Sequence, residues 1–592
     1  MPVFSKVLVA NRGEIAIRVF RTLRELGIGT VAVYSSADRN AAHVAYADEA
    51  YLLGGGAPAE SYLNQERILD AAQRAGAEAI HPGYGFLAEN AEFALACGRA
   101  GLVWIGPPPE AIEAMGSKIE ARERMRAAGV PIVPGVTEPV ESGDEVRRLG
   151  DELGWPVAIK ASAGGGGKGL KVVRAAEEAA RAFESARREG EAYFADTAVY
   201  VERYLEDPRH VEVQVLADAH GNVIHLGERD CTIQRRHQKL VEETPSPAVD
   251  DELRERIGAI AVDAARAVGY QSAGTVEGLL SREGEYFFLE MNTRIQVEHT
   301  VTELVTGLDL VREQVLIAAG EPLSLRQEDV RLNGHAIECR INAEDVGNSF
   351  LPAPGTITAY HEPAGPGVRI DSGVLAGSEI SPLYDPMIAK LVVHGVDREH
   401  ARRRMLRALD ELLVEGVKTL IGFHKALLMH PCFIEGGTCH GLVESELLAA
   451  RAAELENGRG ELLGSDPSRG QTPGLTPAVR TVEVDGRRFE VRVLRPEPPS
   501  AELARRRRER KRGGGAGGAG KDAIVSPMQG TVLAVEVAEG DEVEAGQVVC
   551  IVEAMKMENE VHAHRAGRVT ELSVAPGQPV KTGQVICIVS GD

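Results

Sequence analysis

Two carboxylates, Glu277 and Glu290, fall where the sequence predicts a pair of antiparallel strands. The apolar runs that contain them surround a two-residue Glu-Gly turn, which pairs Arg282 with Glu285 and therefore sets Glu277 opposite Glu290. Opposed carboxylates have Cβ atoms about 4.5–5.5 Å apart and repel each other. Such a pair either lies at the surface with water between the two groups or shares a divalent cation. The apolar run before it favours the cation. Oxygen ligands suit Mg²⁺ or Mn²⁺, with Asn292 as the expected third ligand.

Polar side chains recur at every second residue directly after these strands. Extended backbone places alternate side chains on one face, and that face would carry Asn292, Arg294, Gln296 and Glu298. Two amides, a guanidinium and a carboxylate make a poor core but a good anion site with its own base. The alternative is a charged face in solvent, which the regular mixture of amides and charges disfavours.

A glycine-rich stretch, 161–169, lies between two predicted strands, 155–160 and 170–173. Glycines let backbone N–H groups approach phosphate oxygens closely, and the lysines beside them supply positive charge. The stretch lacks the G-K-[ST] ending of a Walker A loop. A linker is the alternative, but the flanking strands favour a loop that closes over phosphates.

An internal repeat predicts where Lys556 lies. Residues 530–553 and 567–590 align at an offset of 37 positions, with 12 of 24 residues identical. Each copy alternates short Val/Ile-rich runs with glycine turns, which predicts a β-sandwich of two related halves. Lys556 follows the first copy between two methionines. We therefore expect a lysine exposed on a hairpin tip between the halves rather than an ordinary surface charge.

Composition excludes several classes of protein. A chain of 592 residues is too long for one core and predicts three or four domains. The formal net charge of −22 disfavours nonspecific binding to nucleic acid or anionic membranes. No apolar stretch approaches the roughly 20 residues of a membrane span, and the first residues show no signal-peptide pattern. Seven cysteines without a C-x-x-C pair predict neither a disulfide framework nor a zinc site. The chain is therefore expected to be cytoplasmic.

The elements that must position these residues fall into several regions. Strands alternate with helices over residues 1–115, which predicts a parallel α/β sheet, and mixed α and β structure follows. A linker is predicted over 458–477, and residues 479–494 alternate like a hairpin. The arginine-rich run 505–512 is either a nucleic-acid arm or, as the acidic chain favours, a solvated helix end before the flexible Gly/Ala tether 513–520.

Longer strings show that the chain closely resembles biotin carboxylase. They are Ala10–Glu14, His81–Leu87, Glu228–Cys231, Gln234–Lys239, Glu290–Arg294, Glu338–Glu344 and Tyr384–Met387. The departures are Ala88, where serine is common in the family, and Gly278, where an aromatic is common. Gly278 would loosen the packing beside Glu277. The Ala-Met-Lys-Met string around Lys556 resembles a biotinyl domain rather than its lipoyl sister, with a departure at Gln529.

The resemblance implies an α/β and α+β fold in five parts. These are an N-terminal parallel α/β domain (1–115), an ATP-grasp domain (116–330), a C-terminal mixed domain (331–450), a linker with a small hairpin that could dock a partner (451–522), and an all-β biotinyl sandwich (523–592).

The resemblance also implies a role for each matching residue. ATP phosphates and ribose would contact Lys118, Lys160, Gly166, Gly167 and His210, and the adenine would contact residues from Glu202 to Leu205, with Gln234 and His237 beside the nucleotide. Bicarbonate would be held by Lys239, Arg294 and the backbone of Val297. Glu298 would deprotonate it, and Arg340 would stabilise the enolate of biotin. The implied metal ligands are again Glu277, Glu290 and Asn292.

The implied function is ATP- and bicarbonate-dependent carboxylation of biotin carried on Lys556. Attack of deprotonated bicarbonate on ATP would give carboxyphosphate, whose CO₂ is trapped on biotin. Because nothing in the chain resembles a carboxyltransferase, we expect the α subunit of an acyl-CoA carboxylase with a separate β subunit. Its other expected partners are biotin protein ligase and a second carboxylase subunit in a dimer. The alternatives are a subunit of a pyruvate or urea carboxylase, and a biotinylated scaffold or nucleic-acid-binding protein.

Overall fold

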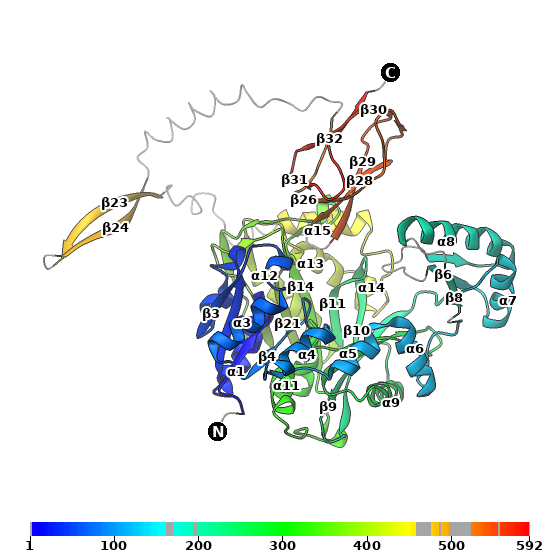
Figure 1. Ribbon diagram of the computed structural model, residues 1–592, viewed down its shortest axis with the longest axis horizontal. Coiled ribbons are helices and arrows are strands. Elements are labelled where there is room, and N and C mark those ends of the chain that lie inside the picture. The colour runs from blue at the N-terminus through cyan, green and yellow to red at the C-terminus, as the bar shows by residue number, and fades with distance from the viewer. Residues whose placement is uncertain are drawn as a thin grey trace. The chain divides into compact units, whose positions relative to one another are not determined.

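The computed structural model describes residues 3–136, 138–161, 170–194, 198–457, 475–484, 487–496, 523–554 and 557–590. It divides into two compact units, Met1–Ala453 and Glu454–Asp592, coloured along the chain in Figure 1. Several predictions fall outside the described residues. They concern Gly166, Gly167, Lys556 and its neighbour Met555, the arginine-rich run and the tether. No helix among the described residues is long and apolar enough to cross a membrane.

A five-stranded parallel sheet of order β3-β2-β1-β4-β5 begins the first unit. Its strands are β1 (Lys6–Val9), β2 (Gly29–Ser35), β3 (Glu49–Gly54), β4 (Ala79–His81) and β5 (Val103–Trp104). Both faces are covered, as parallel sheets require: Val7 and Val9 pack with α1 (Gly13–Glu25), and Leu8 packs with α3 (Gln65–Ala75) and α4 (Ala91–Arg99). The prediction of a parallel α/β region is confirmed, with β3 as an additional edge strand.

A small antiparallel sheet of order β7-β6-β8 follows. Its strands are β6 (Val157–Ala161), β7 (Leu170–Val173) and β8 (Val199–Arg203), and α7 (Gly143–Leu153) and α8 (Ala179–Phe194) pack with it as one lobe in Figure 1. The two strands expected beside the glycine-rich stretch are thus confirmed, and they pair directly, with Lys160 opposite Leu170. Helices α5 (Pro109–Gly116) and α6 (Lys118–Ala127) precede this sheet.

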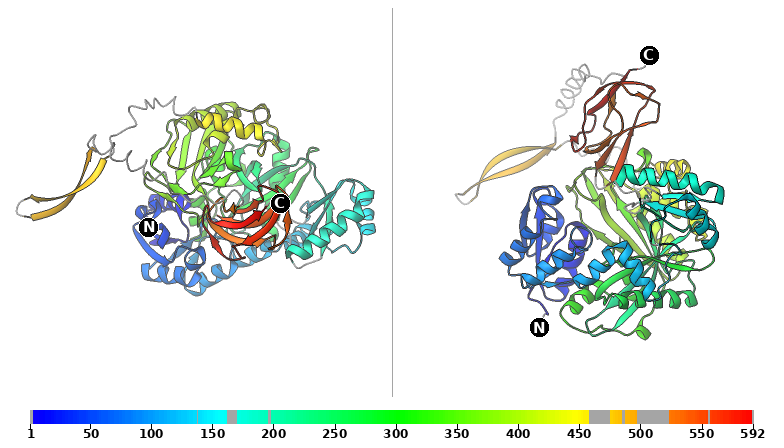
Figure 2. Two further views of the ribbon diagram at one scale, coloured as in Figure 1. Left: turned by 90° about the horizontal axis from the view of Figure 1, so that it is seen from above. Right: turned by 45° about the vertical axis from the view of Figure 1, so that its right-hand side comes forward.

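An antiparallel sheet of eight strands forms the centre of the first unit, beside the N-terminal sheet (Figure 2). In spatial order its strands are β13 (Tyr286–Asn292), β12 (Ser272–Leu280), β9 (Arg209–Ala217), β10 (Val223–Arg235), β11 (Gln238–Thr244), β14 (His335–Asn342), β21 (Met387–Gly395) and β19 (Val368–Ser372). β11 pairs with β14, with Val241 opposite Cys339. The domain boundary expected at residue 331, which stays a prediction, therefore runs through one continuous sheet.

Further helices and short strands complete the first unit, and the last of these helices, α15, ends within the second. The helices are α2 (Ala42–Tyr46), α9 (Asp251–Ala267), α10 (His299–Thr306), α11 (Leu310–Ala318), α12 (Arg398–Glu411), α13 (Ile421–Leu428), α14 (Pro431–Ile434) and α15 (Glu446–Asn457), and the short strands are β15 (Glu344–Asp345), β16 (Leu351–Pro352), β17 (Gly355–Thr356), β18 (Ala359–His361), β20 (Glu379–Ile380) and β22 (Leu413–Glu415). One disulfide joins Cys432 to Cys439. The sequence did not predict this local bridge, and the other five cysteines are free and buried.

The second unit contains a hairpin and a β-sandwich. β23 (Leu475–Val484) pairs with β24 (Arg487–Pro496), which confirms the predicted hairpin. Two four-stranded sheets, β25-β32-β30-β27 and β29-β28-β26-β31, form the sandwich. The strands are β25 (Ala523–Val525), β26 (Gly530–Val535), β27 (Glu542–Val543), β28 (Val548–Ala554), β29 (Met557–His562), β30 (Gly567–Leu572), β31 (Pro579–Val580) and β32 (Val585–Ser590). The first residues of β26, β27 and β28 precede those of β30, β31 and β32 by 37 positions, which confirms the internal repeat.

The register of β12 against β13 confirms the predicted carboxylate pair by an unexpected route. Next to the turn, Leu280 lies opposite Tyr286, so the expected pairing of Arg282 with Glu285 was wrong by one residue. A β-bulge then leaves Leu289 without an opposite residue and restores the register. Glu277 therefore lies opposite Glu290 after all.

Gly278 does not loosen the packing beside Glu277, contrary to the expectation. A Cβ atom added at Gly278 would lie 2.3 Å from Cζ and 2.5 Å from the hydroxyl oxygen of Tyr286. The ring of Tyr286 is buried and belongs to the same apolar cluster as Val276 and Met291. This ring fills the space that a larger residue at 278 would need.

We predict that Gly278→Ala destabilises the first unit by about 1–3 kcal/mol, the usual cost of overpacking. In a Tyr286→Ala background the same substitution should cost much less, because the ring that it would contact is gone. Denaturant unfolding of the four proteins of this double-mutant cycle measures the coupling. Gly98→Ala is the control, since that helical glycine has no atom within 4 Å of an added Cβ. An equal cost in both backgrounds would contradict the packing argument.

Candidate active site

The ammonium group of Lys239 lies among three carboxylates. Its Nζ is 2.5 Å from Glu212 Oε2, 2.9 Å from Glu277 Oε1 and 2.6 Å from Glu298 Oε1. The four residues come from β11, β9, β12 and the turn before α10, and all are buried. Because a buried charge without a partner is costly, the shared cation is what allows three carboxylates to meet here.

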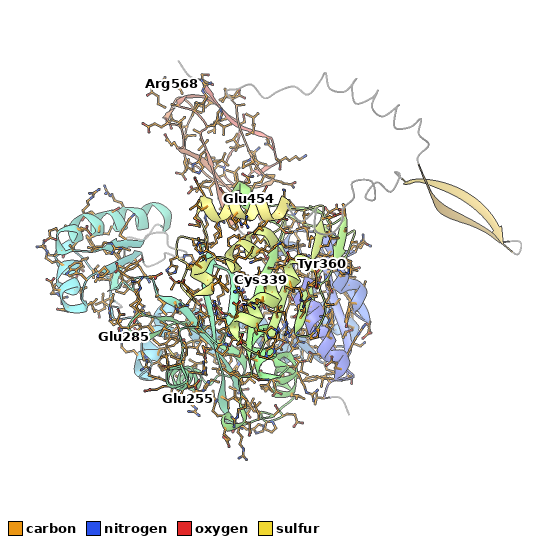
Figure 3. All side chains as sticks on the ribbon, turned by 180° about the vertical axis from the view of Figure 1, so that it is seen from behind. Glu255, Glu285, Cys339, Tyr360, Glu454 and Arg568 are labelled. Atoms are coloured by element: carbon orange, nitrogen blue, oxygen red, sulfur yellow. A yellow bond between two sulfur atoms is a disulfide. The ribbon has the colours of Figure 1, made fainter. Side chains whose placement is uncertain are left out.

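Two guanidinium groups extend this cluster across the eight-stranded sheet, one from each of the strands beside β11. Arg340 on β14 lies 2.9 Å from Glu298 Oε2 and 2.6 Å from Glu242 Oε1. Arg229 on β10 donates from Nε to Glu212 Oε1 at 2.6 Å. Figure 3 labels Cys339, the neighbour of Arg340, on β14 in the eight-stranded sheet of the first unit. The result is a chain of alternating charges across the sheet.

The neighbouring charges set opposite protonation states for two carboxyl groups of this cluster. Burial raises the pKa of Glu298, but the charges of Lys239 and Arg340 outweigh it and hold that pKa well below its ordinary value. Burial raises the pKa of Glu242 to about 8, although Arg340 opposes the shift. At neutral pH Glu298 is therefore ionised and Glu242 carries a proton.

The predicted metal ligands converge on Glu277. Asn292 Nδ2 donates to Glu277 Oε1 at 2.7 Å, and His210 Nε2 lies 2.8 Å from Glu277 Oε2. Glu290 faces Glu277 across the strand pair and is exposed. Carboxylate oxygens are the donors that Mg²⁺ prefers, so this set fits the ion. Glu212 joins His210 and Glu277 in a group whose ligand atoms lie within 4.8 Å of one another, and the sequence did not single it out.

The polar residues after β13 meet at the same place, although the backbone is not extended as predicted. β13 ends at Asn292, and bends and a turn lead into α10. Gln296 Nε2 donates to Glu277 Oε1 at 2.8 Å, and Arg294 donates to Asn292 Oδ1 at 2.9 Å. With Glu298 bound to Lys239, all four predicted side chains join one network.

Apart from His210, the described residues predicted to contact ATP lie at other places in the first unit. On the small sheet, Lys160 pairs with Glu202, which also lies 3.1 Å from Arg122. Leu205 is buried in a small apolar cluster with Val133 and Phe287. These residues lie on or beside the sheet whose strands flank the glycine-rich stretch.

Three further residues predicted to contact ATP lie at the ends of other elements. Gln234 donates to the carbonyl of Cys231 at 2.7 Å, near the end of β10. His237 occupies the exposed turn between β10 and β11 with a φ of 65°. Lys118 begins α6. Their roles, like those of the other nucleotide residues, stay predictions.

Sequence reasoning missed Glu212, Arg229, Glu242 and Lys390. The signal for Glu212 is alternation, because His210, Glu212 and Gln214 share one face of β9. Glu212 also lies opposite Glu277 in the register of β9 and β12. That pairing joins strands more than fifty residues apart, so no local turn specifies it.

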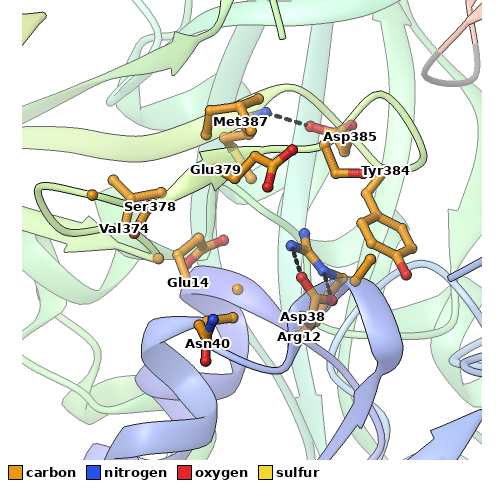
Figure 4. A pocket seen from close by; sticks show the side chains of 17 residues that line it. Arg12, Glu14, Asp38, Asn40, Val374, Ser378, Glu379, Tyr384, Asp385 and Met387 are labelled. Carbon is orange, nitrogen blue, oxygen red and sulfur yellow. Dashed lines mark hydrogen bonds and ion pairs between the residues drawn. The ribbon is translucent and has the colours of Figure 1, made fainter. Parts of the chain in front are cut away.

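A separate pocket of about 160 Å³ opens beside the start of α1 (Figure 4). Arg12 closes one wall by donating to both oxygens of Asp38 at 2.6 and 2.7 Å. Glu14 and Tyr384 also line it. The walls thus come from two of the strings that the sequence singled out, Ala10–Glu14 and Tyr384–Met387.

Family models match most of the chain. They are the biotin carboxylase N-terminal domain over residues 3–112, the carbamoyl-phosphate synthase L chain ATP binding domain over 117–326, the biotin carboxylase C-terminal domain over 338–445, and the biotin-requiring enzyme model over 522–589.

Known proteins resemble the chain over different lengths. The α3 subunit of a biotin-dependent acyl-coenzyme A carboxylase from Mycobacterium leprae is 48% identical over 95% of both chains. A pyruvate carboxylase subunit from Methanothermobacter thermautotrophicus is 57% identical over 73% of this chain and 88% of its own. Among solved structures, the biotin carboxylase domain of Hydrogenobacter thermophilus 2-oxoglutarate carboxylase, in complex with MgADP and bicarbonate, is 50% identical. It covers 75% of this chain and 99% of its own, with a TM-score of 0.68.

The protonated state of Glu242 predicts a dependence of stability on pH. Folding raises the pKa of Glu242 to about 8. The contribution of Glu242 to the free energy of unfolding is therefore full below the pKa of the unfolded chain, and it is lost as the pH rises through about 8. The melting temperature should therefore fall between pH 6 and pH 9, and Glu242→Gln should reduce that fall by a few degrees. Glu243→Gln is the matched control, because hydrogen bonds from His335 and Arg398 outweigh burial and lower the pKa of Glu243 to about 2. An unchanged slope in Glu242→Gln would show that Glu242 is ionised at neutral pH.

Proposed function

The chain belongs to the biotin carboxylase family, and from this premise we propose that it is the α subunit of an acyl-CoA carboxylase. It joins an ATP-dependent biotin carboxylase to a biotin carrier domain, and its cofactors and substrates include biotin, Mg²⁺ and ATP. The proposed reaction is carboxylation of the biotin on Lys556, followed by transfer of the carboxyl group to an acyl-CoA on a separate β subunit.

The order of domains is the observation that carries the acyl-CoA assignment. The mycobacterial acyl-CoA carboxylase relative aligns over 95% of both chains, so the alignment includes the linker and the carrier as well as the carboxylase. The alignment with the pyruvate carboxylase relative covers only 73% of this chain. A pyruvate or urea carboxylase subunit remains the alternative assignment, and substrate assays distinguish them.

Bicarbonate is a weak nucleophile until a base removes its proton. We assign Glu298 as that base, with Lys239 and Arg294 holding the anion. In the free protein Lys239 and Arg340 depress the pKa of Glu298, which makes it a poor base. A bound anion would draw Lys239 toward itself, raise the pKa of Glu298 and so allow it to accept the proton.

Glu242 keeps the charge of Arg340 available. Since burial raises the pKa of Glu242 to about 8 and so favours its neutral form, Glu298 is the carboxylate that binds Arg340 in the ionised state. Once Glu298 takes a proton, Arg340 becomes a net positive charge beside the reacting groups. That timing suits the proposed role of Arg340, which is to stabilise negative charge in the second half of the reaction.

Two bound groups would supply the rest of the chemistry. Mg²⁺ would offset charge on the ATP phosphates, and biotin would provide the nitrogen that accepts the carboxyl group. Glu277 is the central proposed metal ligand, with Glu290 and Asn292. Lys556 lies outside the described residues, but the strands on either side of it pair directly, with Ala554 opposite Met557. We propose that biotin protein ligase attaches biotin there.

The partners are proposed on the same basis. A carboxyltransferase β subunit would complete the reaction, and the carboxylase units would form dimers within the hetero-oligomer. The hairpin of β23 and β24, which lies between the carboxylase and the carrier in the chain, is the proposed docking element.

We predict that the native complex, purified through its biotin, carboxylates acetyl- or propionyl-CoA with labelled bicarbonate and ATP, and leaves pyruvate and urea unlabelled.

Lys556→Arg should abolish acyl-CoA carboxylation but preserve carboxylation of free biotin, because only the carrier loses its attachment site. Labelling of pyruvate or urea without labelling of an acyl-CoA would refute the acyl-CoA assignment. Biotin found on intact Lys556→Arg protein would refute the attachment site.

A further inference from the structure

Lys390 is a fully buried lysine on β21 that lies directly opposite Arg340 in the register of β14 and β21. Directly opposed residues of neighbouring strands share a face of the sheet, so the two cations project together. Lys390 Nζ donates to the carbonyl oxygen of Val297 at 2.9 Å. Arg340 binds the carboxylate of the next residue, Glu298, also at 2.9 Å.

Lys390 has the carboxylate residue Asp371 of β19 opposite it on one side, and it also contacts residues of the N-terminal domain. Its Nζ lies 3.4 Å from Glu14 Oε2 and 5.7 Å from the ring centre of Tyr84. Glu14 is buried at the start of α1 and forms part of the pocket wall in Figure 4. Glu14 and Tyr84 belong to the strings Ala10–Glu14 and His81–Leu87, to which the proposed reaction gives no role.

We propose that Lys390 is a positioning residue that fixes the peptide between Val297 and Glu298, and that Glu14 holds Lys390 in place. The inference rests on the proposed role of Glu298 as the base. A peptide group is planar, so a bond that fixes the Val297 carbonyl also fixes the Glu298 N–H and the position of the Glu298 Cα atom that carries the side chain. Lys390 and Arg340 thus hold the base at both ends, one through the backbone and one through the carboxylate.

This arrangement gives the N-terminal domain a part in catalysis. The base lies in the turn before α10, and the two cations that hold it, Lys390 and Arg340, lie on β21 and β14 of the eight-stranded sheet. Glu14 connects that turn to α1 through Lys390. A purely structural ion pair between Glu14 and Lys390 would stabilise the fold without changing how the site uses bicarbonate, and kinetics separate the two roles.

The test uses the full-length holoenzyme and measures bicarbonate-dependent ATP cleavage with free biotin. Lys390→Met keeps the length of the side chain and removes the donor. We expect kcat/KM for bicarbonate to fall about 10–100-fold, since a displacement of about 1 Å can cost about 10²-fold, while the Kd for MgADP stays within about twofold. Lys425→Met is the matched control: Lys425 is also buried and paired, with Asp410 at 2.5 Å, and its loss should leave both constants unchanged.

Glu14→Gln provides a second test that preserves volume, and it decides the question if Lys390→Met does not fold. It should lower kcat/KM for bicarbonate in the same direction and by a smaller factor. The inference is overturned if a folded Lys390→Met enzyme, or Glu14→Gln in its place, uses bicarbonate like the wild type. It is also overturned if bicarbonate use and MgADP binding fall together. A wild type without bicarbonate-dependent ATP cleavage would overturn the proposed function itself.

Discussion

The ammonium of Lys239, shared by three buried carboxylates, is the interaction on which the rest of the site depends. Six consecutive strands, in the order β12-β9-β10-β11-β14-β21, each contribute a charged side chain to the surrounding stripe. In that order the contributors are Glu277, Glu212, Arg229, Lys239, Arg340 and Lys390. The sheet must therefore be continuous across residue 331, because Arg340 and Lys390 belong to the part of the chain that follows it. Without these cations, burying the carboxylates of Glu212, Glu277 and Glu298 would cost too much free energy.

Protonation divides the carboxyl groups of this stripe into two kinds. Glu298 is held ionised by two cations, whereas burial leaves Glu242 neutral at pH 7. The pair lies on either side of Arg340, at 2.9 and 2.6 Å. A proton taken by Glu298 would thus change the net charge around Arg340 while Glu242 stays as it was. Different environments push two nearby carboxyl groups apart in pKa, which is a recurring device of acid–base sites.

The sequence specified local features better than the contacts between distant strands. The repeat in the sandwich and the hairpin of β23 and β24 follow from periodicity and turns, and both are confirmed. The pairing of Glu277 with Glu290 is also correct, but it depends on a bulge that no turn rule predicts. Glu212 and Lys390 were missed because their neighbours lie on strands remote in sequence. Gly278 was misjudged because its space is filled by Tyr286, which only tertiary packing could reveal.

The central claim is that Glu298 is the base, held ionised until bicarbonate arrives. Bicarbonate-dependent ATP cleavage by Glu298→Gln tests it most directly, because the amide preserves shape but cannot accept the proton. The account predicts a rate about 10²–10⁴-fold below that of the wild type, the usual effect of losing a general base, with MgADP binding nearly unchanged. Turnover within about threefold of the wild type would mean that Glu298 does not take the proton.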